Sequence, residues 1–244
     1  MLRKIVISSI LIFTIVSLSF ADKTCVIDTP NVNMLDCDSY NVTIKFLSGG
    51  TFVPSGNFSI FKWFNIGGSL ELGKLIGKGD EPLKVAIPAF QVKFKVYEGN
   101  MTYPAIAIGF DGQGYFFDSG YSWDYLQKGR GIYLVIGREF FVENLMFNIG
   151  ANINIINISN DDKIHGFINL VVPLFREIIY LVAECDNIIP LLSTRVNLGL
   201  RFALTEFVNI DCIVRDCCLG LVKMPDDGRL FNERIIRISH SFKF

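Results

Sequence analysis

Only two histidines occur in the chain, His165 and His240, and acid–base or nucleophilic chemistry would be built around them. His240 has a serine on each side, Ser239 and Ser241. Adjacent side chains of an extended strand point to opposite faces, so neither serine is placed to be activated by this histidine. His165 begins a predicted strand next to a polar loop, where we expect an interfacial position. The sequence therefore predicts no catalytic residue and no enzymatic activity.

Six cysteines offer a second route to chemistry, through metal binding or redox change. The chain has no Cys-x-x-Cys pair and no histidine placed as a partner, so the spacing favours neither a metal site nor a cofactor. Cys25 and Cys37 are close enough in the sequence to form a disulfide, and the sequence leaves open whether they do. The other cysteines are expected to be small apolar residues or free thiols.

Charged residues at alternate positions of the predicted strands are the third set with functional potential. When each strand is phased by its apolar face, the opposite face points inward and carries Glu71, Lys93, Asp111, Glu184, Asp186, Arg195, Arg201, Asp211 and Arg237. Asp186 is expected opposite Arg195, and Asp211 beside Arg237, across antiparallel ladders. These charges can fill a small interior as a salt-bridged plug, or line a water-filled pore of weak selectivity. Charges of both signs are present and no ring of like charges is found, so strong ion selectivity is not expected. The plug or narrow pore is favoured.

The elements that position these charges are about twelve strands of alternating polarity, with lengths that suit tilted membrane strands. The strands are predicted at 42–48, 57–62, 65–73, 89–97, 105–112, 131–139, 144–155, 164–172, 176–186, 194–203, 207–215 and 233–244. The last of them places Ile236, Ile238, Phe242 and Phe244 on one face and polar residues on the other. An aromatic end of this kind is typical of outer-membrane barrels, whose final strand closes the wall at the lipid interface.

The connections and the aromatic residues separate a membrane barrel from a soluble β-sandwich. Odd-numbered connections are predicted to be long, as at 49–56, 113–130 and 216–232, and even-numbered ones short, as at 140–143 and 204–206. Aromatic residues gather at the short turns, as in an interface girdle. The predicted fold class is therefore all-β, a closed antiparallel transmembrane β-barrel of about 12 strands in the bacterial outer membrane. Both termini are expected in the periplasm, because the strand number is even.

The amino terminus predicts export. A basic start is followed by an uncharged apolar run at 5–20 and by small residues before Ala21, which is the pattern of a cleaved signal peptide. We expect a signal peptide at 1–21, a periplasmic amino-terminal segment at 22–40 and a barrel domain at 41–244. The formal net charge of −1 argues against nucleic acid as a partner.

An aromatic-rich segment is predicted to lie in an outer loop. Its candidate partner-binding residues are Tyr115, Phe117, Tyr121, Trp123 and Tyr125. Such a surface can stack on sugars or dock a partner, or it can form an outer interface belt, and the structural explanation is favoured. The other expected partners are outer-membrane lipid, lipopolysaccharide and the barrel-assembly machinery, the last through the strand that ends at Phe244.

Several strand segments also resemble a known family. The segments 104–115, with its Gly-Phe-Asp sequence, 131–140, 181–186 and 197–203 together resemble bacterial outer-membrane barrels related to the YjbH-like family, over about residue 35 to the carboxyl end. Family members often carry tyrosine where this chain has Cys185, and larger members have additional domains. The resemblance implies an outer-membrane barrel with an association to exopolysaccharide secretion and supplies no active-site residues.

Two functions follow as expectations. The first is a non-catalytic narrow pore or structural envelope protein. The alternative is a secretion or partner-docking barrel associated with exopolysaccharide export, which would have an exported polysaccharide as its partner.

Overall fold

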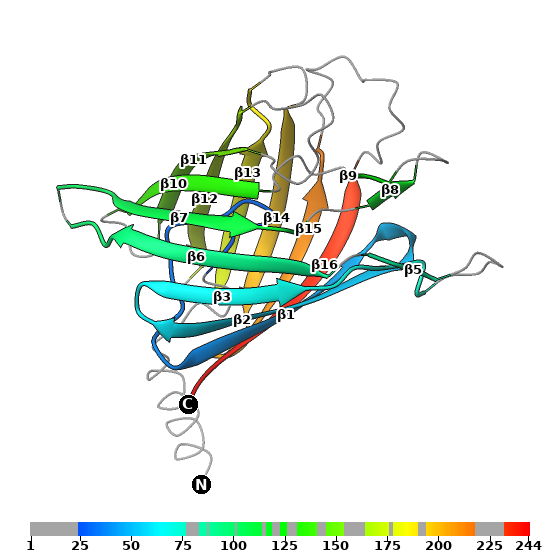
Figure 1. The fold of residues 1–244 in the computed structure, drawn as a ribbon, viewed down its shortest axis with the longest axis horizontal. Helices are drawn as coiled ribbons and strands as arrows, with labels where there is room; N and C mark the ends of the chain where they lie inside the picture. The colour runs from blue at the N-terminus through cyan, green and yellow to red at the C-terminus, as the bar shows by residue number, and fades with distance from the viewer. Residues whose placement is uncertain are drawn as a thin grey trace, which may run out of the picture.

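The computed structural model describes residues 24–76, 83–86, 88–100, 102–113, 116–118, 123–125, 131–140, 145–153, 164–175, 178–189, 194–217 and 232–244. Figure 1 shows that the strands of this part of the chain form a closed β-barrel. The main sheet has 14 strands, and without the two-residue strands β4 (Leu72–Gly73) and β5 (Lys84–Val85) twelve remain to build the wall. The wall strands are β1 (Ser39–Leu47), β2 (Thr51–Phe61), β3 (Phe64–Ser69), β6 (Ala89–Tyr97), β7 (Ala105–Asp111), β10 (Gly131–Glu139), β11 (Met146–Ile153), β12 (Ile164–Phe175), β13 (Ile179–Asp186), β14 (Arg195–Ala203), β15 (Val208–Arg215) and β16 (Glu233–Lys243).

The barrel closes where its first and last strands meet. Every wall strand pairs antiparallel with its neighbours in the chain, and β1 pairs with both β2 and β16. The closing register sets Asn41 opposite Ser241 and Lys45 opposite Arg237. Closure gives each of the twelve described wall strands a neighbour on both sides, which is the condition for a sheet to lie in lipid. Within the described residues, no helix is long and apolar enough to cross a membrane.

The predicted strands agree with the wall strands in order and place, and the largest boundary differences are at the start of the second strand and the end of the third. The connection predicted at 49–56 is wrong, because β1 and β2 are joined by a single 3-10 turn, η1 (Ser48–Gly50). Gly49 and Gly50 have positive φ of 81° and 74°, which glycine adopts at little cost, and this allows so tight a turn. The third strand ends at Ser69 instead of continuing to residue 73.

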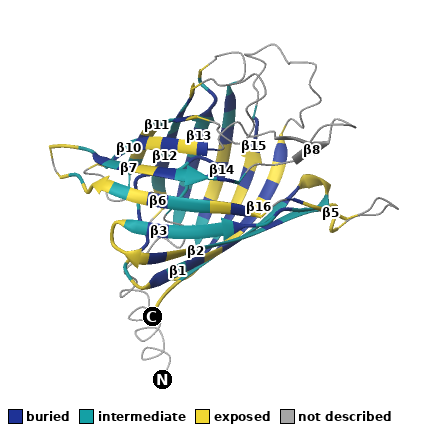
Figure 2. Ribbon diagram, in the orientation of Figure 1, coloured by how far each residue is buried: buried dark blue, intermediate teal, exposed yellow. Residues whose placement is uncertain are grey.

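The two faces of the wall differ in composition, as the alternation predicts. Along β14, Arg195, Asn197 and Arg201 are buried inside the barrel, whereas Leu198 and Leu200 are exposed outside it. Figure 2 shows the same alternation as stripes along the strands. An exposed apolar surface that extends around the whole wall has the composition required for contact with lipid. The chain is thus a transmembrane β-barrel.

Aromatic side chains cluster at the end of the barrel where the chain terminates. The Phe244 ring lies 5.4 Å from the Tyr40 ring and 6.1 Å from the Phe58 ring. Trp63, in the short turn between β2 and β3, stacks on Phe61 at 5.2 Å. Aromatic rings are largely apolar, and a band of them is suited to the interface between lipid and water.

Close packing of rings against glycines inside the wall leads to the first testable prediction. A Cβ at Gly109 would lie 2.3 Å from the Tyr133 hydroxyl and 2.4 Å from the Val92 carbonyl oxygen, and that backbone oxygen cannot move cheaply. We expect Gly109→Ala to lower the free energy of unfolding by about 1–3 kcal/mol, the usual cost of overpacking. A Cβ at Gly56 meets nothing within 4 Å, so Gly56→Ala is the matched control. Urea unfolding of the refolded barrel in detergent would measure the stability of both variants. Equal unfolding midpoints for Gly109→Ala and Gly56→Ala would contradict the prediction.

Candidate functional site: the occupied lumen

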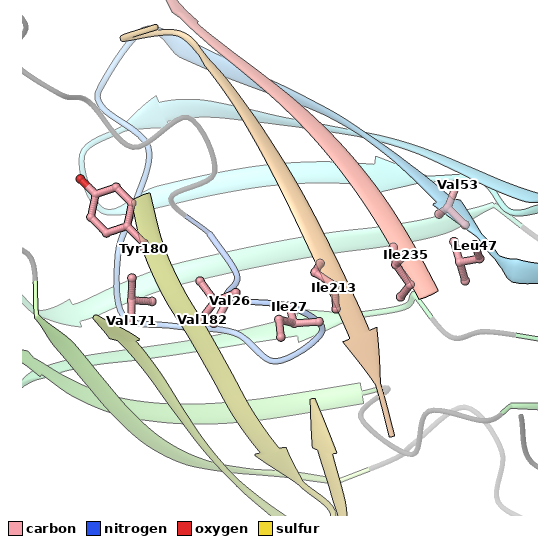
Figure 3. Packing of buried hydrophobic residues seen from close by; sticks show 9 residues of the cluster. All are labelled: Val26, Ile27, Leu47, Val53, Val171, Tyr180, Val182, Ile213 and Ile235. Atoms are coloured by element: carbon pink, nitrogen blue, oxygen red, sulfur yellow. The ribbon is translucent and has the colours of Figure 1, made fainter. Parts of the chain in front are cut away.

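Residues 24–35, called here the inner segment, lie inside the barrel. Val26 and Ile27 are completely buried and belong to an apolar cluster with inward-facing residues of β13, β15 and β16. Figure 3 shows their side chains among Val182, Ile213 and Ile235. The periplasmic segment predicted at 22–40 includes this inner segment, whose residues 24–35 lie within the lumen. A barrel of eight strands is filled by its own side chains, so a wall of twelve leaves room for a segment of chain.

The tip of the inner segment is held by the carboxylate of Glu184 on β13. The backbone N–H groups of Ile27, Asp28 and Thr29 donate to it at 3.2, 3.0 and 2.9 Å. The Thr29 hydroxyl donates at 2.8 Å and the Asn197 amide at 2.6 Å. Successive backbone N–H groups that converge on one anion form a nest. Glu184 therefore carries a buried negative charge that is satisfied mainly by the inner segment.

A second anchor joins the same tip to β14, β15 and β16. Asp211 accepts from Arg201 Nε at 3.0 Å and from Arg237 Nε at 2.6 Å, so one carboxylate orients two buried guanidinium groups. Both guanidinium groups then donate to the Val26 carbonyl, at 3.3 Å from Arg201 and 2.5 Å from Arg237. Arg237 also donates to the Ile27 carbonyl at 3.2 Å. These strong, charge-assisted bonds fix the backbone carbonyls of the tip, whereas Glu184 fixes its N–H groups.

The third anchor is the side chain of Asp28, which forms ion pairs with Lys45 on β1 at 3.0 Å and with Arg215 on β15 at 2.8 Å. Arg215 is also paired with Glu233 at 2.7 Å. Burial of one charge without a partner is costly, and this network gives each charge at least one opposite neighbour.

Amide side chains attach the returning part of the inner segment to β11 and β12. Asn148 accepts from the Val32 N–H at 3.1 Å and donates to Asn169 at 2.7 Å. Asn169 donates in turn to the Thr29 hydroxyl at 2.9 Å and to the Pro30 carbonyl at 3.0 Å. The sequence prediction named charged inward residues only, although the inward phase of these two asparagines could have added them. That these asparagines bind the inner segment could not be predicted from strand periodicity.

The charged residues predicted on the inward face fall into three groups in the structure. Asp186 lies directly opposite Arg195, with an ion pair of 2.9 Å, and Asp211 lies opposite Arg237. Glu184, Arg201, Asp211 and Arg237 meet at the tip of the inner segment, as described above. The remaining three residues lie elsewhere, with Lys93 and Asp111 beside a cavity and Glu71 buried beyond the end of β3.

A polar cavity remains between the inner segment and the part of the wall formed by β1, β2, β3, β6, β7 and β10. Its volume open to the centres of water molecules is about 70 Å³. Lys93 crosses to the inner segment at one edge, where its ammonium group donates to the Thr24 and Asn33 carbonyls at 3.1 and 2.6 Å. Asp111 accepts from the Gln91 amide at 3.2 Å. Small and amide side chains such as those of Asn57, together with apolar side chains such as those of Val53 and Phe110, complete the lining.

Other candidate residues are placed as follows. Phe117, Trp123 and Tyr125 belong to the two-stranded sheet of β8 (Phe116–Asp118) and β9 (Trp123–Tyr125), while Tyr115 and Tyr121 lie outside the described residues.

The structure corrects the expectation for His165 and answers the question that the sequence left open for Cys25 and Cys37. His165 is buried on the inward face of β12 and does not lie at an interface, because its strand places it opposite Asn152 inside the wall. Cys25 and Cys37 are not joined by a disulfide. Cys25 contacts Arg237 inside the lumen, whereas Cys37 donates to the Ile60 carbonyl at the end of β2. In the part of the chain that is described, no cluster of three or more His, Cys, Asp or Glu residues could hold a metal ion.

The fold and its interior define a class, a transmembrane β-barrel whose lumen is occupied by its own amino-terminal segment. No model of a known protein family matches the chain, and no curated protein sequence matches it. A solved structure described as "KdgM porin" aligns with 84% of this chain and 99% of that chain, at a TM-score of 0.49 and 11% sequence identity. At such low similarity the match carries no information on what this chain binds or transports.

Proposed function

We propose that this barrel is a narrow, non-catalytic polar pore of the bacterial outer membrane, with its lumen restricted by the inner segment. The observation that carries the proposal is the polar cavity left beside that segment. An apolar outer wall supports insertion in a membrane, and the short turns and the aromatic cluster near Phe244 support periplasmic termini. The surrounding lipid and lipopolysaccharide, and the barrel-assembly machinery acting on the last strand, are the partners that this proposal entails.

The use of the charges supports a narrow pore over a wide one. Glu184, Asp211 and the arginines beside them donate to or accept from the inner segment or each other, so these charges hold the segment in place instead of lining open water. Space for a solute is then limited to the cavity between the inner segment and the opposite part of the wall. A lining with both signs and no ring of one sign gives weak ion selectivity.

The direct test is the conductance of the refolded protein in a planar bilayer. Folding is first verified by a shift in gel mobility on heating. We expect discrete current steps that are small for a barrel of this strand number and nearly independent of the sign of the ion. A folded protein that inserts and gives no current would overturn the pore and favour a purely structural envelope role.

The alternative of a barrel for exported polysaccharide depends on the outer aromatic segment. Two of its five residues, Tyr115 and Tyr121, lie outside the described part of the chain, so no contact supports that function. The narrow pore is the function that the lumen supports best.

A further inference from the structure

The cavity beside the inner segment is a place where the wall presents polar groups to space that no atom of the described residues fills. The inner segment packs against β13, β15 and β16, and the open volume lies on the other side of it. Thr24, Cys25, Asp28 and Pro30 of the inner segment form one side of the cavity, and wall strands form the rest. A solute that enters this space therefore contacts both the segment and the wall.

The charges around the cavity cancel. Two acids, Asp28 and Asp111, and two bases, Lys45 and Lys93, line it, so their formal sum is zero. Each is already engaged by protein groups: Asp28 with Lys45 at 3.0 Å, Lys93 with backbone carbonyls, and Asp111 with Gln91 at 3.2 Å. An anion or a cation that enters gives up hydration without gaining a net opposite charge from the lining.

The rest of the polar lining consists of amides and hydroxyls. Asn57, Asn65 and Gln91 supply amide groups, while Ser55 and Tyr133 supply hydroxyls. Amides and hydroxyls each donate and accept hydrogen bonds, and so does every hydroxyl group of a polyol. An uncharged polyhydroxylated solute can therefore replace water in the cavity with little loss of hydrogen bonding.

The volume limits the size of the solute. About 70 Å³ is open to the centres of water molecules. This corresponds to about five to seven waters at ~10–15 Å³ each. We infer that the cavity is a subsite for a neutral, polyhydroxylated solute of about the size of a monosaccharide. The inference rests on the proposed pore and assigns its solute class.

The test uses block of the ionic current by added sugar, with the full-length mature protein in a planar bilayer. Three probes of similar size differ in charge: glucose is neutral, gluconate is negative and glucosamine is positive. We expect glucose to reduce the current through the open protein at concentrations where gluconate and glucosamine have a much smaller effect. Gln91→Leu keeps a similar volume but removes an amide from the lining, so it should weaken the block by glucose several-fold, with the block measured as a fraction of each variant's own open current.

Three further variants complete the test, one as a control for general disturbance and two that add a charge to the lining. Phe90→Leu changes the neighbouring residue on the exposed outer face and should leave the block as it is in the unmodified protein. Gln91→Glu and Gln91→Lys give the lining a net charge and should admit glucosamine and gluconate, respectively. A conducting protein that glucose does not block, or that all three probes block equally, overturns the subsite and keeps the pore. A folded protein that gives no current overturns both.

Discussion

Replacement of Glu184 by glutamine is expected to release the inner segment and enlarge the conductance. The carboxylate accepts three backbone N–H groups and one hydroxyl group from that segment, whereas a glutamine side chain has one oxygen and turns an NH2 group toward donors. Loss of hydrogen bonds to a buried charge costs about 1.5–3 kcal/mol. The ratio of released to bound segment should therefore rise about ten- to hundredfold.

The measurement is single-channel recording with a matched control on the same strand. Asp186 is also a buried inward carboxylate of β13, but the ion pair described for it is with Arg195 of the wall and not with the inner segment. Asp186→Asn should lower stability without opening the lumen. Glu184→Gln should show longer or larger open states than both the control and the unmodified protein. Equal conductance in all three would contradict the assignment of Glu184 as the anchor of the segment.

Asp211→Asn is expected to give the largest loss of stability of any single change in the lumen. Asp211 is almost fully buried between Arg201 and Arg237, so its neutralisation leaves two buried guanidinium groups without their shared counter-charge. Breaking a buried ion pair by removing one partner typically costs about 3–5 kcal/mol. Part of this cost can be recovered if the inner segment leaves and water solvates the two guanidinium groups. A larger conductance should therefore accompany the loss of stability.

Urea unfolding in detergent, followed by the heat-dependent gel shift, would measure this effect. Glu98→Gln is the control, because Glu98 is an exposed carboxylate in the turn between β6 and β7. Its unfolding midpoint should remain close to that of the unmodified protein, because exposed charges contribute about 0–1 kcal/mol. If Asp211→Asn were as stable as Glu98→Gln, the paired arginines would have to be solvated, and the dense network described here would be wrong.

The two effects have one origin in the tip of the inner segment. Glu184 binds its N–H groups, and the arginines oriented by Asp211 bind the carbonyls of Val26 and Ile27. The backbone of the tip therefore has its donors and its acceptors satisfied by the wall, as buried backbone requires. Complete burial of Val26 and Ile27 adds about 1.5–3 kcal/mol each. Apolar burial holds the segment in the lumen, and the polar anchors fix its position.

The strands of the wall and their inward faces can be read from the local pattern of the sequence. Alternation of apolar and polar residues is a local property of an extended chain, so the strands and their inward faces could be assigned without knowledge of the fold. Pairing of Asp186 with Arg195 followed in the same way, because consecutive antiparallel strands leave few registers that keep both apolar faces outside. The tight turn at Gly49–Gly50 was missed because the first residues of β2 alternate poorly and include Pro54 and Gly56.

The contents of the lumen were decided only by the tertiary structure. Residues 24–35 have no periodic pattern that points to a partner, and their contacts join positions more than 100 residues apart, as between Ile27 and Glu184. Whether such a segment enters depends on the width of the closed wall and on which inward groups still need partners. Both are properties of all twelve strands together, so no local pattern encodes them. For the same reason the thiols of Cys25 and Cys37 are separated despite their closeness in the sequence: one lies in the lumen and the other at its end.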